Sequence, residues 1–284
     1  MNQYPITGLN VKTSVIFSTY NSTKWLEKVL WGFNAQTDPD FEVVIADDGS
    51  KSETADLIKR IQSETGLNIQ HVWQEDDGFQ KCRIMNKAIL ASTGDYLIFT
   101  DGDCIPRSDF VATHKANAEP GHYLSGGYFK LPMKTSEAIT KQDIDNGNAF
   151  DAKWLISNGL NKSHKISKLT AKGWRQKLFN RITPTKRTWN GHNASTWKEN
   201  FFLVNGFDER MQYGGEDCEF GDRLRNSGIK PKQIRYSAIC VHLDHARGYV
   251  NDEMLKKNKA IRDNTTKNKA TKTEFGLNLY QQEK

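Results

Sequence analysis

The sequence predicts an α/β fold, in which a mostly parallel β-sheet carries helices on both faces. Apolar runs at residues 14–18, 41–46 and 96–100 have the length and composition of buried strands. Between the first two runs, apolar residues recur at helical spacing: Trp25, Leu26, Val29, Leu30 and Phe33. Alternating strands and helices are joined by crossover connections, which favour parallel strands with the helices packed against the sheet.

Further elements continue this alternation. Ser50 and Glu53 have the spacing of a capping box, which predicts that a helix begins there. A third strand is expected at residues 69–73, and a helix at 80–91. The strand at 96–100 then completes a βαβα series, and such sheets bind ligands at the carboxyl ends of their strands.

After about residue 130 the alternation weakens, and we divide the chain into four segments. Their boundaries are residues 1–130, 131–188, 189–250 and 251–284. The first is the α/β half, and the second, rich in Lys, Asn and Ser, is expected to vary and to lie over or beside the site. The third is the other half of the same domain, with a helix near 216–226 and a strand near 234–241. The fourth is expected to be a basic tail, helical and then loose.

Composition narrows the class of protein. The 284 residues include 37 % apolar residues, and no apolar run approaches the roughly 18 residues that suggest a membrane span. The four cysteines form no Cys-x-x-Cys pair, so reduced thiols in a soluble cytoplasmic protein are expected. Much of the net charge of +6 comes from late Lys and Arg residues. This tail is either a solvated face or, as a hypothesis, a peripheral contact with the anionic inner face of a membrane.

Three polar clusters follow the predicted strands. They are Thr19-Tyr20-Asn21, Asp47-Asp48-Gly49-Ser50 and Asp101-Gly102-Asp103. Since the carboxyl ends of parallel strands meet at one sheet edge, these clusters should lie together. Two carboxylates one residue apart can bind a hard divalent cation and the phosphates that it carries, although an acidic turn after a strand is also common.

With further motifs, these clusters resemble a known family. Gly94-Asp95-Tyr96 lies between them in the order seen in family-2 glycosyltransferases of the GT-A fold. Gly206-Phe207-Asp208-Glu209 and Gly215-Glu216-Asp217 resemble the C-terminal part of galactosyltransferase and chondroitin-polymerase catalytic domains. The resemblance covers roughly residues 12–245. It implies a GT-A fold, with a Rossmann-like nucleotide-sugar half and a C-terminal extension on the acceptor side.

The resemblance implies a donor site along the sheet edge. Thr19, Tyr20 and Asn21 would line the base pocket, Asp48 would bind the base or ribose, and Asp101 and Gly102 would lie near the ribose. On the helix after the third strand, Arg83 and Asn86 are expected to contribute to nucleotide binding. Asn193 is expected close to the donor sugar or the acceptor.

A metal site is also implied. Asp103 would coordinate Mn²⁺ or Mg²⁺, which neutralises the departing nucleoside diphosphate as a Lewis acid. The predicted strand at 234–241 leads into His242 and His245, and either histidine, or neither, would complete the site, because a lone His is more often structural.

The catalytic and acceptor groups are expected from the second half. By resemblance, Asp217 is the general base that accepts the acceptor hydroxyl proton, and Glu216 holds the acceptor or places that base. Gly215 gives a flexible approach to the pair. Trp189 stacks on a sugar or packs in the core, and His192 lies close to the donor sugar or acceptor.

The sequence therefore predicts a metal-dependent glycosyltransferase. The resemblance implies transfer of a sugar, with inversion, from a nucleotide sugar that is UDP-linked in the family's common case. The acceptor would be a glycan or lipid-linked glycan in polysaccharide or lipopolysaccharide synthesis. One alternative is a nucleotidyltransferase, although Thr19-Tyr20-Asn21 replaces its glycine-rich loop. Another is a basic protein that binds nucleic acid or membrane without catalysis. We expect no nucleic-acid partner, because the acidic clusters would repel phosphates.

Overall fold

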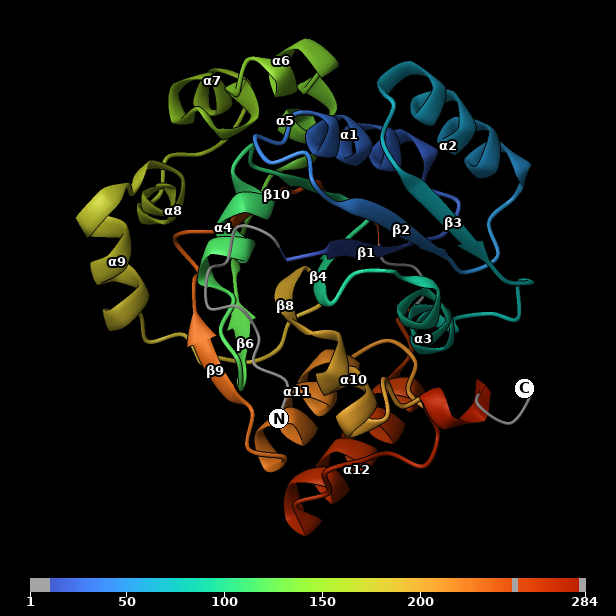
Figure 1. Cartoon of the computed structure of the whole chain (residues 1–284). Helices are drawn as coiled ribbons and strands as arrows, with labels where there is room; N and C mark the ends of the chain where they lie inside the picture. Colours follow the sequence, from blue (N-terminus) through green and yellow to red (C-terminus); the bar gives the residue numbers. More distant parts are fainter. Residues whose placement is uncertain (1–10, 247–249, 281–284) are drawn as a thin grey trace.

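The computed structural model describes residues 11–246 and 250–280 (Figure 1). Its centre is a seven-stranded sheet in the order β3-β2-β1-β4-β8-β6-β9. The predicted strands form its parallel part: β1 (Thr13–Thr19), β2 (Glu42–Asp47), β3 (Ile69–Trp73) and β4 (Tyr96–Asp101). β8 (Asn193–Trp197) lies antiparallel between β4 and β6 (His122–Ser125), and β9 (Lys230–Gln233) extends the edge. The mostly parallel α/β prediction is confirmed.

Helices cover both faces because side chains alternate along the strands. On β1, Val15 and Phe17 belong to one core cluster and Ile16 to the other. The first cluster lies under α1 (Thr23–Asn34) and α2 (Ser52–Thr65), with α4 (Phe110–Asn117) nearby. The second lies under α3 (Lys81–Ala91), α10 (Lys198–Val204) and α11 (Glu216–Asn226).

A second sheet of three strands joins the two halves of the chain. β10 (Ile239–His242) lies between β5 (Cys104–Pro106) and β7 (Gly127–Lys130). β10 is shorter than the strand expected at 234–241. Its register pairs His242 with Cys104, and the Leu243 amide donates to the Asp103 carbonyl oxygen at 2.9 Å. This pairing carries His242 to the acidic turn after β4.

The segment 131–188 folds into short helices at one side of the sheet (Figure 1). They are α5 (Met133–Ala138), α6 (Lys141–Asp145), α7 (Ala152–Ser157), α8 (Ser167–Thr170) and α9 (Gly173–Ile182), with 3₁₀ turns at Asn148–Phe150 and His164–Ile166. α5 is tied to α1 where Lys28 Nζ donates to the Ser136 carbonyl oxygen at 2.8 Å.

The C-terminal segment is helical, as expected, over α12 (Asp252–Asn268), but the residues after it are not loose. α12 packs on α11, and Thr265 Oγ1 donates to Glu219 Oε1 at 2.8 Å. The 3₁₀ turn Leu277–Tyr280 places Leu277 in the second core cluster. Within the described ranges, no helix combines the length and apolarity needed to cross a membrane.

Candidate active site

The ends of β1, β2 and β4 open into one cavity of about 690 Å³. The three polar clusters predicted at these strand ends all contribute to its wall, and the two halves of the chain meet across it. Sequence-predicted residues that line it are Thr19, Tyr20, Asn21, Asp48, Asp101, Gly102, Asp103, His192, Glu216, Asp217, His242 and His245. The wall also contains residues that were not among the predicted site residues, including Trp25, Asp76, Phe79, Lys81, Tyr128 and Tyr213.

The loops after β1 and β2 hold each other at one end of the cavity. The Asn21 amide donates to Ser50 Oγ at 2.8 Å, and Asn21 Oδ1 accepts from the Lys51 amide at 3.0 Å. Ser50 therefore supports this loop and does not cap α2, whose N-cap position is Lys51. Tyr20 donates to Asp76 Oδ2 at 2.9 Å. Thr19 Oγ1 is buried and has no hydrogen-bond partner within the described residues, so a ligand can satisfy it.

Asp48 is fixed at the same end of the cavity. Its carboxylate accepts from Gln74 Nε2 at 2.7 Å and from the Gln80 amide at 2.9 Å. Burial raises its pKa, although these two hydrogen bonds act in the opposite direction. A hydrogen-bonded carboxylate in this position is a rigid acceptor for donors on a ligand.

Lys81 opens α3 and points into the acidic side of the cavity. Its Nζ lies 3.2 Å from Asp101 Oδ1. Burial disfavours both charges, but the charge of Asp101 holds the pKa of Lys81 well above its usual range, and Lys81 lowers the pKa of Asp101. The sequence signal for Lys81 was a cation at the start of a helix after the third strand, which is equally typical of a solvated face.

Gly102 allows the acidic turn after β4 to lie against β1. A Cβ at this position would lie 2.6 Å from the Ser18 carbonyl oxygen, so a larger residue would push the turn away. The tight turn places Asp101 beside Lys81 and directs Asp103 toward β10.

Asp103, His242 and His245 form a group that could hold a metal ion. Their ligand atoms lie within 4.8 Å of one another. Asp103 Oδ2 is 2.8 Å from His245 Nε2 and 3.6 Å from His242 Nε2. One carboxylate oxygen and two imidazole nitrogens suit Mn²⁺ better than Mg²⁺, because Mg²⁺ strongly prefers oxygen.

Glu216 and Asp217 occupy the first turn of α11. Gly215 precedes them with a φ of 92°, a left-handed conformation that favours glycine. Glu216 Oε2 accepts from the Gly214 amide at 2.8 Å, which directs this carboxylate back onto its own loop. Burial, together with the negative charge of Glu216, raises the pKa of Asp217 to about 7, and Lys81 opposes this shift. Asp217 can therefore exchange a proton near neutral pH.

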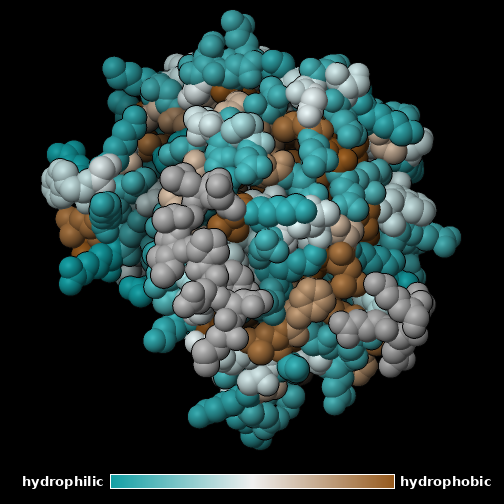
Figure 2. Space-filling view, in the orientation of Figure 1, coloured by the Kyte–Doolittle hydropathy of each residue, from teal (hydrophilic) through white to brown (hydrophobic). Residues whose placement is uncertain are grey.

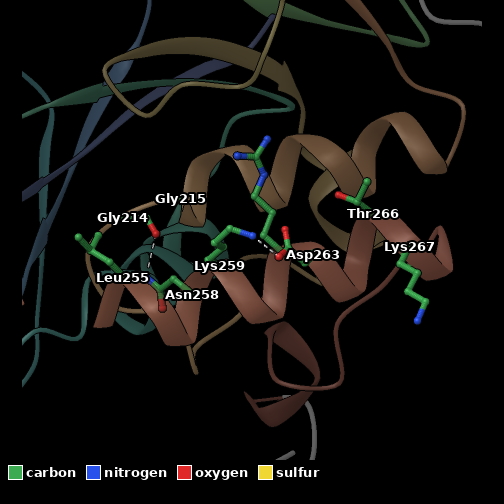
Figure 3. Close-up of a pocket in the computed structure, with 9 residues that line it drawn as sticks. Gly214, Gly215, Leu255, Asn258, Lys259, Asp263, Thr266 and Lys267 are labelled. Carbon is green, nitrogen blue, oxygen red and sulfur yellow. Dashed lines mark hydrogen bonds and ion pairs between the residues drawn. The ribbon is translucent and has the colours of Figure 1, made fainter. Parts of the chain in front are cut away.

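Asn258 of α12 supports the loop that leads into this helix. Its Nδ2 donates to the carbonyl oxygens of Gln212, Tyr213 and Gly214 at 3.0, 3.1 and 3.0 Å. Figure 3 shows Asn258 beside Gly214 in a second hollow, of about 770 Å³, between α12 and this loop. Gly215, predicted to contact the acceptor, lines this second hollow.

Three of the predicted donor-binding residues lie outside the cavity wall: Asn86, Arg83 and Asn193. Asn86 is fully buried on α3, where its amide donates to the Phe207 carbonyl oxygen and to Glu209 Oε1, both at 2.9 Å, and accepts from the Phe207 amide. It supports the loop before α11. Arg83 is half-exposed and forms a 3.6 Å ion pair with Asp77. Helical spacing from Lys81 turns the Arg83 and Asn86 side chains away from the cavity.

Two residues expected near the sugars are also structural. Trp189 is fully buried and packs against Phe99 and Phe220 in the second core cluster. Asn193 is fully buried, and its Nδ2 donates to the Gly127 and Ala238 carbonyl oxygens at 2.8 and 3.0 Å. These bonds join β8 to the second sheet. The Trp, Tyr and Phe side chains on the cavity are instead Tyr20, Trp25, Phe79, Tyr128 and Tyr213.

His192 alone of the residues 189–193 lines the cavity. Its ring lies 4.3 Å from that of Tyr128. Burial lowers its pKa to about 4, so the ring is neutral at physiological pH. Its Nε2 is buried without a hydrogen-bond partner in the described part of the chain.

Comparison with known proteins shows which families the sequence of this chain matches. Residues 14–193 match the model of glycosyl transferase family 2, and residues 179–246 match the model described as the N-terminal domain of galactosyltransferase. Chondroitin synthase of Escherichia coli is 27 % identical over 251 residues, which cover 85 % of this chain and 36 % of that protein. The chain thus spans about a third of that relative's length.

Solved structures agree on the fold. A mannosyltransferase from Pyrobaculum calidifontis, in complex with GDP-Man and Mn²⁺, has a TM-score of 0.55 at 21 % identity and covers 84 % of this chain and 59 % of that one. GalNAc-T7 with UDP, GalNAc and Mn²⁺ has a TM-score of 0.59 at 15 % identity and covers 89 % of this chain and 48 % of that one. At these identities the likeness shows a shared GT-A fold. The family match covers more than half of the chain, which therefore belongs to glycosyl transferase family 2.

Proposed function

We propose that this glycosyltransferase moves a sugar from a UDP-sugar to a hydroxyl group of a glycan, with a divalent metal ion bound at Asp103 and with Asp217 as the base. The observation that carries the proposal is that one cavity contains both the Asp103–His242–His245 group and a carboxylate whose pKa is raised to about 7. The first can hold a metal beside a diphosphate, and the second can accept a proton.

The donor would lie along the ends of β1, β2 and β4. Thr19, Tyr20 and Asn21 would border the base, and Asp48 would accept hydrogen bonds from the base or ribose. Asp101 and Gly102 would lie nearer the ribose and diphosphate. We favour UDP because the family resemblance implies it and because GalNAc-T7 is in complex with UDP, whereas the mannosyltransferase is in complex with GDP-Man. Arg83, Asn86 and Asn193 are not part of this proposed site.

Asp103, His242 and His245 would hold the metal, with Mn²⁺ favoured over Mg²⁺ by the two imidazoles. When bound, such an ion supplies Lewis acidity that neutralises the departing diphosphate. Both similar structures contain Mn²⁺. Lys81 adds a second positive charge on the same side of the cavity, 3.2 Å from Asp101.

Asp217 would accept the proton of the acceptor hydroxyl as that oxygen attacks the anomeric carbon. A single direct displacement inverts the anomeric centre. Glu216 accepts from the Gly214 amide, so its role would be to fix the loop that positions Asp217. Neutral His192 would bond to a sugar hydroxyl through its unpartnered Nε2.

The acceptor would approach from the second half of the chain, past the Phe79 and Tyr213 rings, whose centroids are 6.1 Å apart. Aromatic faces suit sugar rings. A glycan or a lipid-linked glycan in polysaccharide or lipopolysaccharide synthesis fits this class of enzyme. The free cysteines fit the reducing cytoplasm. A nucleotidyltransferase is no longer favoured, because residues 14–193 match a glycosyltransferase family.

Calorimetric titration with UDP, in the presence and absence of Mn²⁺, tests the proposal. Binding should require Mn²⁺ and should be lost in Asp103→Ala. Arg83→Ala is the matched control, because Arg83 is on α3, which borders the cavity, but its side chain lies outside the cavity wall. The Arg83→Ala variant should bind UDP normally. Binding of UDP that is indifferent to both Mn²⁺ and Asp103→Ala would exclude the proposed metal site.

A further inference from the structure

Helix α9 has one face fixed to the body of the protein. Gln176 Nε2 donates to the Tyr236 carbonyl oxygen at 2.8 Å, and Asn180 Oδ1 accepts from the Tyr236 amide at 2.8 Å. Asn180 Nδ2 donates to Ser237 Oγ at 2.8 Å, and the Phe179 ring lies 5.2 Å from that of Tyr236. The helix is therefore held rigidly against the segment that leads into β10.

The opposite face of α9 is apolar and exposed. Trp174, Leu178 and Ile182 have 69 %, 40 % and 60 % of their surface exposed. They are spaced four residues apart, so they form one stripe along the helix. Figure 1 places α9 at the rim of the molecule, and Figure 2 shows brown, hydrophobic atoms on that rim surrounded by hydrophilic ones. No residue of this stripe lines either hollow described above.

Positive charge borders the stripe on both sides. At about 100° per residue, Lys177 and Arg181 fall on one side of it and Arg175 on the other. Lys172, Lys186 and Arg187 add exposed cations just beyond the helix ends. Between Asp151 and Glu199 every charged side chain is Lys or Arg. Among described residues, none of these six cations forms an ion pair, and Arg175 lies over the Trp174 ring of the stripe at 5.6 Å.

We propose that α9 is an interfacial anchor, which lies in the plane of an anionic membrane with Trp174, Leu178 and Ile182 inserted between headgroups. An exposed apolar stripe bordered by Lys and Arg is the pattern of helices that lie on membranes. The cations would contact anionic headgroups. The inference depends neither on the donor nor on the catalytic base.

The basic tail expected from the sequence is a weaker candidate for the same role. Leu255 is the large apolar residue exposed on α12, and it packs against Gly214. Asp252, Glu253 and Asp263 interrupt the cations of that helix. α12 therefore lacks a charge-bordered apolar stripe. Nucleic acid would use the cations of α9 but would not explain the exposed Leu178 and Ile182.

Co-sedimentation of the full chain with vesicles tests the proposal. Wild-type protein should bind vesicles of phosphatidylcholine with phosphatidylglycerol, and should bind phosphatidylcholine alone much more weakly. Arg175→Gln/Lys177→Gln/Arg181→Gln should weaken partition about 100-fold, since each interfacial cation contributes roughly fivefold. The matched control Lys256→Gln/Lys257→Gln/Lys267→Gln removes the same charge from exposed positions of α12 and should retain wild-type partition. An equal loss in both variants, or no partition of the wild type, would refute the anchor.

Insertion of the apolar stripe is tested separately. Brominated lipids should quench Trp174 when it enters the membrane, and Trp174→Phe should retain partition but lose that part of the quenching. Trp174→Ser/Leu178→Ser/Ile182→Ser should lose partition while still binding UDP with Mn²⁺. Vesicle binding that persists in this triple variant would overturn the proposal. A different result would assign this face of α9 to nucleic acid: the wild-type protein binds single-stranded RNA but no vesicles, and the α9 charge variant loses the RNA binding.

Discussion

The carboxylate of Asp217 packs directly against Gly191. A Cβ at position 191 would lie 2.7 Å from Asp217 Oδ2 and 2.8 Å from Oδ1, and the Gly191 amide donates a hydrogen bond to the same carboxylate. Gly191 thus does two things for the proposed base: it leaves the space that Asp217 occupies, and it orients the carboxylate. The neighbouring His192 then lines the cavity.

Gly191→Ala should displace the Asp217 carboxylate, because the new methyl group would overlap its oxygens. We expect kcat for sugar transfer to fall about 100-fold, the size of effect that a misplacement of about 1 Å can produce. Binding of UDP with Mn²⁺ should change little. Gly228→Ala is the control: no atom lies within 4 Å of its added Cβ, although its φ of 86° carries strain, so it should lower stability without lowering kcat. A normal kcat in Gly191→Ala would contradict the assignment of Asp217 as the base.

Asp217→Asn should retain UDP binding and lose transfer, because the amide keeps the shape of the side chain but cannot accept the proton. The expected loss is about 10²- to 10⁴-fold. In the wild type, kcat should rise with pH through about 7, as Asp217 deprotonates. The measurement is a pH–rate profile at saturating donor. The residual rate of Asp217→Asn should show no such rise, and an unchanged profile in this variant would contradict the assignment.

The same group predicts how stability depends on pH. An unfolded Asp titrates near 3.9, whereas burial and Glu216 raise the pKa of Asp217 to about 7 in the fold. Between these values the native state binds the extra proton, so this residue's contribution to the free energy of unfolding falls as pH rises. In Asp217→Asn this pH-dependent decrease in the free energy of unfolding is absent, because the amide does not titrate. Its Tm should exceed that of the wild type by more at about pH 8 than at about pH 5. A constant difference would mean that Asp217 titrates normally.

The sequence located the cavity better than it located individual side chains. The strand ends were predictable because parallel topology follows local rules, whereas the Gly215-Glu216-Asp217 motif was assigned by its resemblance to the family. Asn86 and Asn193 are buried in the core and do not line the cavity, and Trp189 takes the core position that was one of its two predicted alternatives, because residue type does not reveal burial. The sequence does not distinguish an Asn that forms hydrogen bonds with backbone groups in the core from an Asn that binds a ligand. Gly191 carried no visible signal, since its need for space depends on a residue 26 positions away.

Lys81 could not be separated by sequence from a surface lysine, yet the structure places its charge among those of Asp101, Asp217 and Glu216. Lys81→Gln removes a charge that lowers the pKa of Asp217. The rising limb of the pH–rate profile should therefore move to higher pH, and kcat at neutral pH should fall. Lys87→Gln, on the same helix but outside the cavity wall, is the control and should leave the profile in place. A limb that stays fixed in Lys81→Gln would show that Lys81 does not act on the base.

Asn258 links the C-terminal helix to the loop that precedes the proposed base Asp217. It is buried, and it donates to three consecutive carbonyl oxygens of the loop that precedes Glu216 and Asp217. Asn258→Ala would leave these carbonyls unpaired, at a cost of about 1–3 kcal/mol each when buried, so the loop should relax away from its present path. We expect kcat to fall about 10- to 100-fold, with UDP binding retained. Asn264→Ala, on an exposed position of the same helix, should match the wild type. If Asn258→Ala lowered only Tm and left kcat unchanged, α12 would support the fold without positioning the catalytic loop.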